Sequence, residues 1–407
     1  MPPSSSIRVP VATLALLSAI APLATDMYLP GFVGMADDFD SPASAVQLTL
    51  TTFMIGLAVG QLVVGPLSDR YGRRRPLLLS IALCLVATVL CALAPTVGVL
   101  VALRLVQGLT GAAGLVIGRA VISDTTEGPR ASRLFGVLMV IGGVAPVVAP
   151  LLGGVLVVWT GWRSVFWVLA AVTALMLALV ALRLPETLPA GRRRGGGATA
   201  LATTGARLLR DRAFLGYALT FAFSFGAMFA YISASPFVLG TVLGLSTGWY
   251  TVDFAVNAAL LCAVSALNGA LVGRIATRRL LATGVTVLTV AAVGLVAAAL
   301  TAVSAWIVLP LLAVALASLG LILPNATALA SDRARQAAGT GSALLGGAQF
   351  TLAAVVTPLV GLGSGALPMA IGMLACAVIA ATSLAALTRT GTSPSAVARP
   401  EPVGVRG

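Results

Sequence analysis

Three charged residues lie inside long apolar stretches and are the first candidates for chemistry. Asp26 lies late in an otherwise uncharged stretch that begins after Arg8 and ends before Asp37. Arg104 and Asp253 lie in two further apolar stretches. A charge at the centre of a membrane-spanning helix costs about 2.5–3.5 kcal/mol on insertion scales, so such residues are expected to pair or to serve transport. The chain contains no His, and a proton relay through it must therefore use carboxylates.

The composition around these residues is that of a membrane protein. Hydrophobic residues make up 59% of the chain and charged residues only 9%, whereas soluble domains carry about 25% charged residues. Apolar runs of about 20 residues recur, each long enough to cross a hydrocarbon core of about 30 Å as a helix. The net charge of +13 comes from arginines in the connections between runs, which is typical of membrane topology and argues against nucleic-acid binding.

Polar breaks divide the chain into twelve predicted transmembrane helices. Their limits are 10–32, 44–66, 76–95, 98–120, 133–157, 163–183, 213–239, 249–272, 280–302, 306–329, 338–362 and 366–387. The first run also fits a signal peptide, but similar runs continue to residue 388, so we expect a retained span. Arginines gather in alternate connections, while the opposite connections hold Asp37, Asp38 and Asp40 with one arginine, Arg163. This asymmetry predicts that both termini are cytoplasmic.

The two halves of the chain repeat each other. GPLSDRYGRRRPLLL (65–79) follows the second predicted helix and GALVGRIATRRLLA (269–282) follows the eighth, while Ser-Asp pairs at 123–124 and 331–332 end the fourth and the tenth. The offsets of 204 and 208 residues indicate a duplicated six-helix unit. We therefore expect an all-α membrane fold of two pseudo-symmetric six-helix bundles, 1–183 and 213–388, with a cytoplasmic linker, 184–212, and a disordered cytoplasmic tail, 389–407.

The first arginine-rich connection combines glycines and an acid with its arginines and is more specific than a run of charges. Its two glycines allow close helix approach and a tight turn, its acid can accept hydrogen bonds from a helix N-terminus, and its arginines can pair with that acid. The contacts could latch the two halves on the inner side, whereas the alternative is a basic loop that only fixes topology. The residues of this predicted gating loop are Gly65, Asp69, Arg70, Gly72, Arg73 and Arg74.

The motif GPLSDRYGRRRP resembles the signature cytoplasmic loop of the major facilitator superfamily. PLATDMYLPGF (22–32) is similar to the first-span motif of the bicyclomycin/chloramphenicol-resistance (Bcr/CflA) branch of drug:proton antiporters, and RLVQGLTGAAG (104–114) resembles its fourth-span motif. FSFGAMFAYISASPFV (223–238) and FAVNAAL (254–260) resemble the branch's seventh and eighth spans. The resemblance covers roughly residues 10–388.

GGVAPVVAPLLGG (142–154) resembles the fifth-span antiporter motif, with Ala149 where the general pattern has Gly and the branch tolerates Ala. Its small residues and prolines predict a smooth, kinked helix that a partner can approach closely. The resemblance implies that this face meets the eighth span and seals the two halves, while ordinary glycine-rich packing is the alternative. The motif residues are Gly142, Gly143, Pro146, Pro150, Gly153 and Gly154.

Asp26 and Arg104 lie at matching depths, about 7–9 Å below the predicted outer boundary of their spans. They are therefore expected to form a water-accessible, proton-coupling pair or to share a network in the first half, and a purely structural salt bridge is the alternative. Arg does not deprotonate in proteins, so Asp26 is the member that would titrate. Asp253, four residues into the eighth span, is either an acid at the outer rim or a second charge that faces the cavity.

Candidates for substrate contact combine aromatic or thioether surface with a few polar atoms, as small-ligand cavities do. Ordinary packing between helices is the alternative for each of them. They are Tyr28, Gln107, Met228, Tyr231, Phe237, Asn257 and Asp253.

The resemblance implies proton-coupled efflux of small amphipathic drugs such as chloramphenicol or bicyclomycin, by alternating access, across a bacterial cytoplasmic membrane. The expected partners are the drug and the lipid bilayer, the protein is expected to be a monomer, and the proton is the coupling ion with no metal or other cofactor. An exporter of one endogenous metabolite and a proton-coupled importer remain as alternatives. A chain without Lys cannot build the Walker motif of ATP-driven pumps, and the intramembrane residues offer neither an enzyme's catalytic constellation nor a channel's charged ring.

Overall fold

The computed structural model describes residues 11–126, 145, 148–189, 191, 193, 197–301, 304–363 and 365–388. Within these ranges the chain is helical apart from short connections and one isolated bridge between Val272 and Ile275. Eleven of the described helices are long and apolar enough to cross a membrane, and a shorter apolar helix, Val148–Thr160, lies at the fifth predicted span. The predicted all-α membrane fold is confirmed.

The helices of the first half keep close to the predicted limits. They are α1 (Val11–Asp26), the 3₁₀ turn η1 (Leu29–Gly31), α2 (Phe32–Asp38), α3 (Ala43–Tyr71), α4 (Arg74–Ala92), α5 (Val97–Thr125), the helix Val148–Thr160 and α7 (Arg163–Arg183). The second half consists of α9 (Arg212–Phe237), the π-helical turn η3 (Val238–Val242), α10 (Thr247–Leu271), α11 (Thr277–Thr301), α12 (Ala305–Arg333), the 3₁₀ turn η4 (Arg335–Ala337), α13 (Ala338–Val360) and α14 (Leu367–Leu387).

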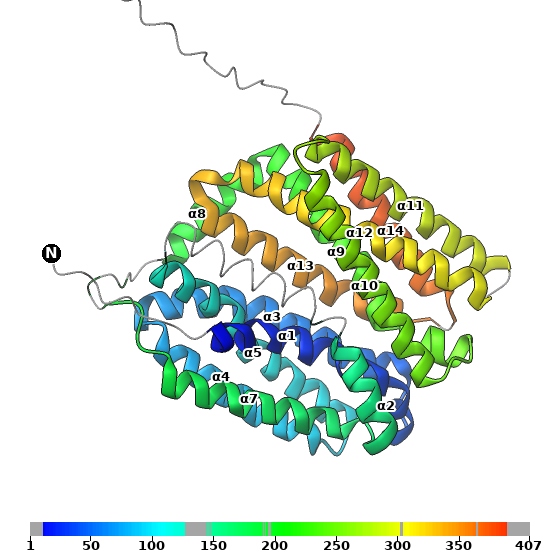
Figure 1. The fold of residues 1–407 in the computed structure, drawn as a ribbon, viewed down its shortest axis with the longest axis horizontal. Helices are drawn as coiled ribbons and strands as arrows, with labels where there is room; N and C mark the ends of the chain where they lie inside the picture. Colours follow the sequence, from blue (N-terminus) through cyan, green and yellow to red (C-terminus); the bar gives the residue numbers. More distant parts are fainter. Residues whose placement is uncertain are drawn as a thin grey trace, which may run out of the picture.

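The two halves pack as separate bundles that meet along α3 and α13. In the first bundle α5 contacts α1, α3 and α4, and in the second α12 contacts α9, α10 and α11. Figure 1 shows the first bundle in blue to green below the second bundle in green to orange, with α3 and α13 side by side between them. The site described below lies between these bundles.

The predicted linker contains a helix of its own. α8 (Gly197–Arg210) has basic residues, Arg207 and Arg210, in its last turn, and it contacts α3 of the first half as well as α9 and α13 of the second. It lies at the same end of the molecule as the loop between α3 and α4, which is the cytoplasmic end by the arginine pattern. The helix thus touches both bundles on the cytoplasmic side.

The first span is broken where its acid lies. α1 ends at Asp26, and the chain passes through η1 before it continues as α2 to Asp38. Pro30 lacks the N–H that would bond to the Asp26 carbonyl in a regular helix, and Gly31 instead bonds to the carbonyl of Tyr28 at 3.0 Å. The sequence therefore places an irregular backbone directly after the intramembrane carboxylate.

Candidate functional site

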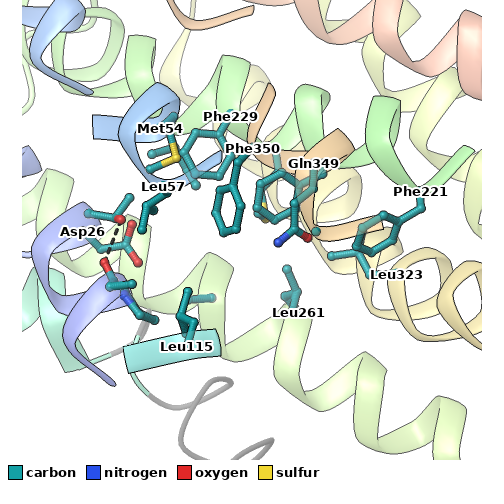
Figure 2. A pocket seen from close by; sticks show the side chains of 18 of the residues that line it. Asp26, Met54, Leu57, Leu115, Phe221, Phe229, Leu261, Leu323, Gln349 and Phe350 are labelled. Carbon is teal, nitrogen blue, oxygen red and sulfur yellow. Dashed lines mark hydrogen bonds between the residues drawn. The ribbon is translucent and has the colours of Figure 1, made fainter. Parts of the chain in front are cut away.

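A cavity of about 650 Å³ lies between the two bundles. Asp26 lies at one end, beside Met54, Leu57 and Phe229, and Phe221 lies with Leu323 at the other (Figure 2). The cavity extends to residues near the cytoplasmic helix ends. The polar and charged side chains among its lining are Ser18, Thr25, Asp26, Gln61, Arg119, Tyr231, Asn257, Thr327, Ser342 and Gln349.

Asp26 enters this cavity from the last residue of α1. Its side chain is buried, and the carboxylate points toward the cavity (Figure 2). Among the described residues it forms no side-chain hydrogen bond and no salt bridge, while its neighbour Thr25 bonds to the Ala21 carbonyl at 2.8 Å. Within the described part of the chain the carboxylate is thus unpaired and open to whatever occupies the cavity.

Arg104 lies on the other side of the same segment of α1. It is fully buried, and its guanidinium lies 4.2 Å from the ring centre of Tyr28 and 4.1 Å from that of Phe53. Its Nη1 donates to Gln107 Oε1 at 2.6 Å, and its Nη2 donates to the Ala24 carbonyl at 3.0 Å. Aromatic faces and neutral acceptors therefore hold this cation.

The predicted pair of Asp26 with Arg104 is absent from the described structure. Matching depth does not fix rotation about the helix axis, and residues 24 and 26 lie about 200° apart on a helix. The guanidinium meets the side of α1 that carries the Ala24 carbonyl and Tyr28, whereas Asp26 points into the cavity. The contact of Arg104 with the segment that carries Asp26 is thus to the backbone of α1, at the Ala24 carbonyl.

The second half contributes a group of polar side chains close to the cavity. Asn257 Nδ2 donates to Asp253 Oδ2 at 3.0 Å and to the hydroxyl of Tyr231 at 3.1 Å, and that hydroxyl lies 3.5 Å from Asp253 Oδ2. Tyr231 and Asn257 line the cavity, and Asp253 lies behind them.

The predicted substrate contacts divide into two groups. Met228, Tyr231 and Asn257 line the cavity, and Tyr28, Gln107, Phe237 and Asp253 do not. Tyr28 lies under Arg104, Gln107 bonds to Arg104 and to Thr88, and the ring of Phe237 packs 6.0 Å from that of Phe32. These side chains hold the helices together around the cavity.

Contacts between the halves close the outer end of the cavity. Gln47 Nε2 of α3 donates to the Ser233 carbonyl of α9 at 3.0 Å. A Cβ on Gly154 would lie 2.4 Å from Thr251 Oγ1 of α10, so this glycine lets the fifth span approach the second half closely. The described part of the fifth-span motif therefore meets the eighth span, as the resemblance implies. The cavity reaches Arg119 near the opposite ends of the helices, which are the cytoplasmic ends by the arginine pattern, so the arrangement corresponds to an inward-facing state.

Other residues of that motif give less information. Pro150 lies in the helix Val148–Thr160, and Gly142, Gly143 and Pro146 lie outside the described residues.

The predicted gating loop is organised around a buried arginine. Arg73 donates from Nε to Asp124 Oδ2 at 2.9 Å, and from Nη1 to Ser68 Oγ at 2.8 Å and Asp69 Oδ1 at 2.5 Å. Burial alone would lower the pKa of Arg73, but the hydrogen bonds and charges of Asp124 and Asp69 outweigh it and raise that pKa. Arg73 thus ties the ends of α3 and α5 together.

A second acid, Glu186, holds the turn of the same loop. It accepts the backbone N–H groups of Arg73 at 2.8 Å, Arg74 at 3.3 Å and Leu188 at 3.0 Å. Burial raises the pKa of Glu186, but these N–H groups and the charge of Arg193 outweigh it, so the pKa lies below its usual value. Gly72 is required here, because its φ is +91° and a Cβ would lie 2.4 Å from Glu186 Oε2.

The remaining loop residues stay within the first half and the linker. The guanidinium of Arg70 lies over the ring of Tyr71, and Arg74 Nη2 donates to the Ala181 carbonyl at 2.8 Å. A Cβ on Gly65 would meet only ordinary contact, 3.8 Å from Val116. In the described inward-facing structure the loop therefore latches elements of its own bundle, and a latch between halves stays a prediction for another state.

The cavity also contains residues that sequence reasoning missed. Five phenylalanines line it, Phe221, Phe225, Phe229, Phe254 and Phe350, and Phe225 stacks on Phe229 with ring centres 4.9 Å apart. The spacing of four residues along the seventh span is a signal that the sequence carries. Arg119 was counted among the arginines that fix topology, but its side chain lines the cavity and has no salt-bridge partner among the described residues.

The described residues contain no group of three or more His, Cys, Asp or Glu side chains that could hold a metal ion.

Comparison with known proteins identifies the family to which this architecture belongs. Residues 14–358 match the family model described as Major Facilitator Superfamily. The chain is 38% identical over 380 residues to "Uncharacterized MFS-type transporter YdgK" of Bacillus subtilis, which covers 92% of this chain and 94% of that protein. It is 31% identical over 380 residues to "Bicyclomycin resistance protein homolog" of Haemophilus influenzae, covering 93% and 96%. It is 28% identical over 371 residues to "Multidrug resistance protein MdtL" of Escherichia coli, covering 89% and 91%.

Solved structures share the fold at low sequence identity. A bacterial homolog of the human lysosomal transporter Spinster, in an inward-facing and occupied conformation, aligns with a TM-score of 0.74 at 18% identity and covers 92% of this chain and 94% of that chain. A D-xylose-proton symporter aligns with a TM-score of 0.72 at 16% identity, covering 93% and 97%.

Proposed function

The chain belongs to the major facilitator superfamily, a family of membrane transporters, and from this premise we propose that it is a proton-coupled exporter of small amphipathic drugs. We infer that it is of the bicyclomycin/chloramphenicol-resistance type and acts as a monomer in a bacterial cytoplasmic membrane. The relatives named for bicyclomycin resistance and for multidrug resistance support this proposal. Fold alone does not decide function, so the argument rests on the cavity.

The observation that carries the proposal is the carboxylate of Asp26 at one end of an aromatic cavity. The acid has no hydrogen-bonding or cationic partner among the described residues, and it faces a space of about 650 Å³. That volume lies in the range of drug-sized ligand sites, which are mostly apolar with a few convergent polar groups. A proton is the coupling ion best suited to a carboxylate that has no permanent counter-ion.

In the proposed cycle the protonation of Asp26 depends on the side of the membrane to which the cavity is open. When the cavity opens outward, Asp26 takes up a proton, and the neutral side chain favours the return to the inward-facing state. In that state, which is the one described, the proton leaves to the cytoplasm and a drug enters between Met228, Phe225 and Phe229. The differential affinity of proton and drug for the two states supplies the coupling.

Arg104 supports this cycle without touching the carboxylate. Its bond to the Ala24 carbonyl and its stacking on Tyr28 fix the irregular end of α1 from which Asp26 projects. We assign it the role of a positioning residue.

Transport in everted membrane vesicles tests the proposal. Bicyclomycin and chloramphenicol are added to energised vesicles, drug accumulation is measured with radiolabel, and proton release from the lumen is followed with a pH-sensitive dye. The wild type should accumulate at least one drug, and Asp26→Asn should abolish accumulation against a gradient while it retains drug binding. Asp37→Asn is the matched control, because Asp37 is exposed in the outer connection and the variant should transport normally.

Two outcomes would contradict the proposal. Accumulation by Asp26→Asn that still depends on the proton gradient would remove the assigned coupling role. A wild type in which no drug changes the proton flux would favour an exporter of a specific metabolite, and uptake in the opposite direction would favour an importer.

A further inference from the structure

A second carboxylate lies near the cavity, on the opposite half from Asp26. Asp253 of α10 accepts from Asn257 Nδ2 at 3.0 Å and lies 3.5 Å from the hydroxyl of Tyr231, while the same Asn257 Nδ2 reaches that hydroxyl at 3.1 Å. The three side chains form a closed triangle, the 253–257–231 triad. Two of them line the cavity that Asp26 also lines.

The triad contains no cation. Asp253 forms no salt bridge among the described residues, and the titratable groups near it are Tyr231 of α9, whose hydroxyl lies 3.5 Å from its Oδ2, and Tyr250 of its own helix. The other elements packed against α10 are η1, η3, α12 and the helix Val148–Thr160. None of these carries an ionisable side chain except at the cytoplasmic end of α12, where Asp332 and Arg333 lie.

Two buried polar atoms beside the triad have no partner. Asn257 is 2% exposed and Tyr250 is 3% exposed, and neither Asn257 Oδ1 nor the hydroxyl of Tyr250 makes a hydrogen bond within the described structure. Buried polar atoms are rarely left unpaired unless water or a functional change of state satisfies them. The orphan oxygen of Asn257 belongs to an amide whose two ends exchange places by rotation.

That rotation gives the triad one hydrogen-bond arrangement for each protonation state of Asp253. With Asp253 ionised, the amide N–H₂ of Asn257 and the hydroxyl of Tyr231 both donate to the carboxylate, as the described geometry has it. With Asp253 protonated, the rotated amide presents Oδ1 to the triad, and it accepts from both the carboxyl O–H and the Tyr231 hydroxyl. The carboxyl group and the Tyr231 hydroxyl therefore keep a hydrogen-bond partner whether the site binds or loses its proton.

Tyr250 connects the triad to the first half. Its hydroxyl lies near Ser235 and within coulombic range of both Asp26 and Asp253. The next residue, Thr251, packs against Gly154 where the halves meet. A buried hydroxyl that has no hydrogen-bond partner in the described structure and that senses the charge of both carboxylates is suited to pass a proton from one bundle to the other.

We propose that Asp253 is a second proton-binding site, that Tyr250 links it to Asp26, and that one proton is carried by each half in every transport cycle. The proposal rests on the proposed function for its place in the cycle, but proton binding at Asp253 is testable without any drug.

Infrared difference spectroscopy of the purified full-length protein in lipid tests proton binding directly. Raising the pH should remove two carboxylic-acid C=O bands in the wild type, and Asp253→Asn should lack one of them while the Asp26 band remains. Asn257→Leu, which keeps the size but not the amide, should shift the frequency and titration midpoint of the Asp253 band alone. Asp37→Asn should match the wild type. An unchanged spectrum in Asp253→Asn, or an Asn257→Leu spectrum identical to the wild type, would overturn the proposal.

Transport stoichiometry tests the place of Asp253 in the cycle. In proteoliposomes with bicyclomycin as the probe, the ratio of protons released to drug moved should fall twofold in Asp253→Asn and in Tyr250→Phe. An unchanged ratio in both variants would overturn the coupling role of the triad. If the wild type moves no drug, the proposed function fails, and the infrared bands still decide whether Asp253 binds a proton.

Discussion

The two halves of the cavity wall contribute different chemistry. Among the described residues, both charged lining residues, Asp26 and Arg119, come from the first half, and that half contributes no aromatic side chain to the lining. The aromatic lining residues of the described structure come from the second half, namely Phe221, Phe225, Phe229, Tyr231, Phe254 and Phe350. In the described lining, the first half of the duplicated unit thus supplies the charges and the second half offers aromatic surface to a ligand.

Corresponding positions show how far the halves have diverged. At the offset of 208 residues, the buried Arg104 corresponds to the buried Leu312, and at the offset of 204 the acid Asp69 corresponds to Gly273. The helix breaks are retained, because Pro30 and Pro236 lie 206 residues apart. Pro30 lies within the 3₁₀ turn η1, and Pro236 lies one residue before the end of α9 and the π-helical turn η3. Backbone irregularity was kept in both halves, whereas the charged residues that line the cavity, among the described residues, lie in the first half.

The largest effect is expected at Arg104, a buried cation in the first half whose counterpart in the second half is apolar. Arg104→Lys keeps the charge, but a compact ammonium cannot stack between two rings and donate to two acceptors at once. Desolvated cation–π contacts are worth about 2 kcal/mol, so the variant should lose at least that much stability and about tenfold or more in drug resistance. The second-half counterpart Leu312→Met should lose less than about 1.5 kcal/mol. Melting temperatures in detergent and growth on drug check both, and equal losses would remove the distinction between the halves.

A smaller effect is expected from the apolar wall of the second half. The ring of Phe225 lies against those of Phe221, Phe229 and Phe350 at 6.4, 4.9 and 5.9 Å. Burying such a side chain is worth about 1.5–3 kcal/mol, so Phe225→Ala should raise the KM for drug about tenfold with kcat little changed. Trp306→Ala is the control, because Trp306 is 90% exposed on α12. A change in kcat without a change in KM would place Phe225 outside the binding site.

The sequence predicted the helices well and the side-chain partners less well. Hydropathy and the internal repeat depend on local composition, so the spans and the two halves follow from them. The pairing of Asp26 with Arg104 failed because depth along a span says nothing of rotation about the helix axis. The cavity lining depends on how α9 and α13 meet the first bundle in one conformational state, which no local pattern contains. Arg119 shows the same limit, because an arginine near a cytoplasmic helix end has the same sequence signature whether it faces lipid headgroups or the cavity.

Substitution of Arg119 changes the charge of the cavity lining in the first half and leaves Asp26 in place. Its side chain lines the cavity together with Leu115, one turn earlier on α5. A charge pair several ångströms apart in a partly solvated site interacts by about 1 kcal/mol, so Arg119→Gln should raise the preference for a cationic dye over a neutral drug about fivefold. Arg183→Gln, at the exposed cytoplasmic end of α7, should leave the preference unchanged. Competition for transport between ethidium and chloramphenicol measures it, and an unchanged ratio in Arg119→Gln would show that this cation does not face the ligand.

The smallest effect is expected at the cytoplasmic turns, where the first half has an acid and the second does not. Because the pKa of Glu186 lies below its usual value, the ionised form stabilises the turn at Gly72. This contribution is complete above the ordinary pKa of about 4.3 and is lost as the pH falls through the lowered one. Amide hydrogen exchange in residues 68–75, corrected for intrinsic rates, should therefore accelerate by up to about fivefold at low pH. A change of this size corresponds to the stabilisation expected from a partly exposed charge interaction. Residues 270–277, whose turn at Gly273 has no such acid among the described residues, should show no such step, and Glu186→Gln should remove the step from the first turn. Equal pH dependence of both turns would mean that Glu186 does not distinguish the halves.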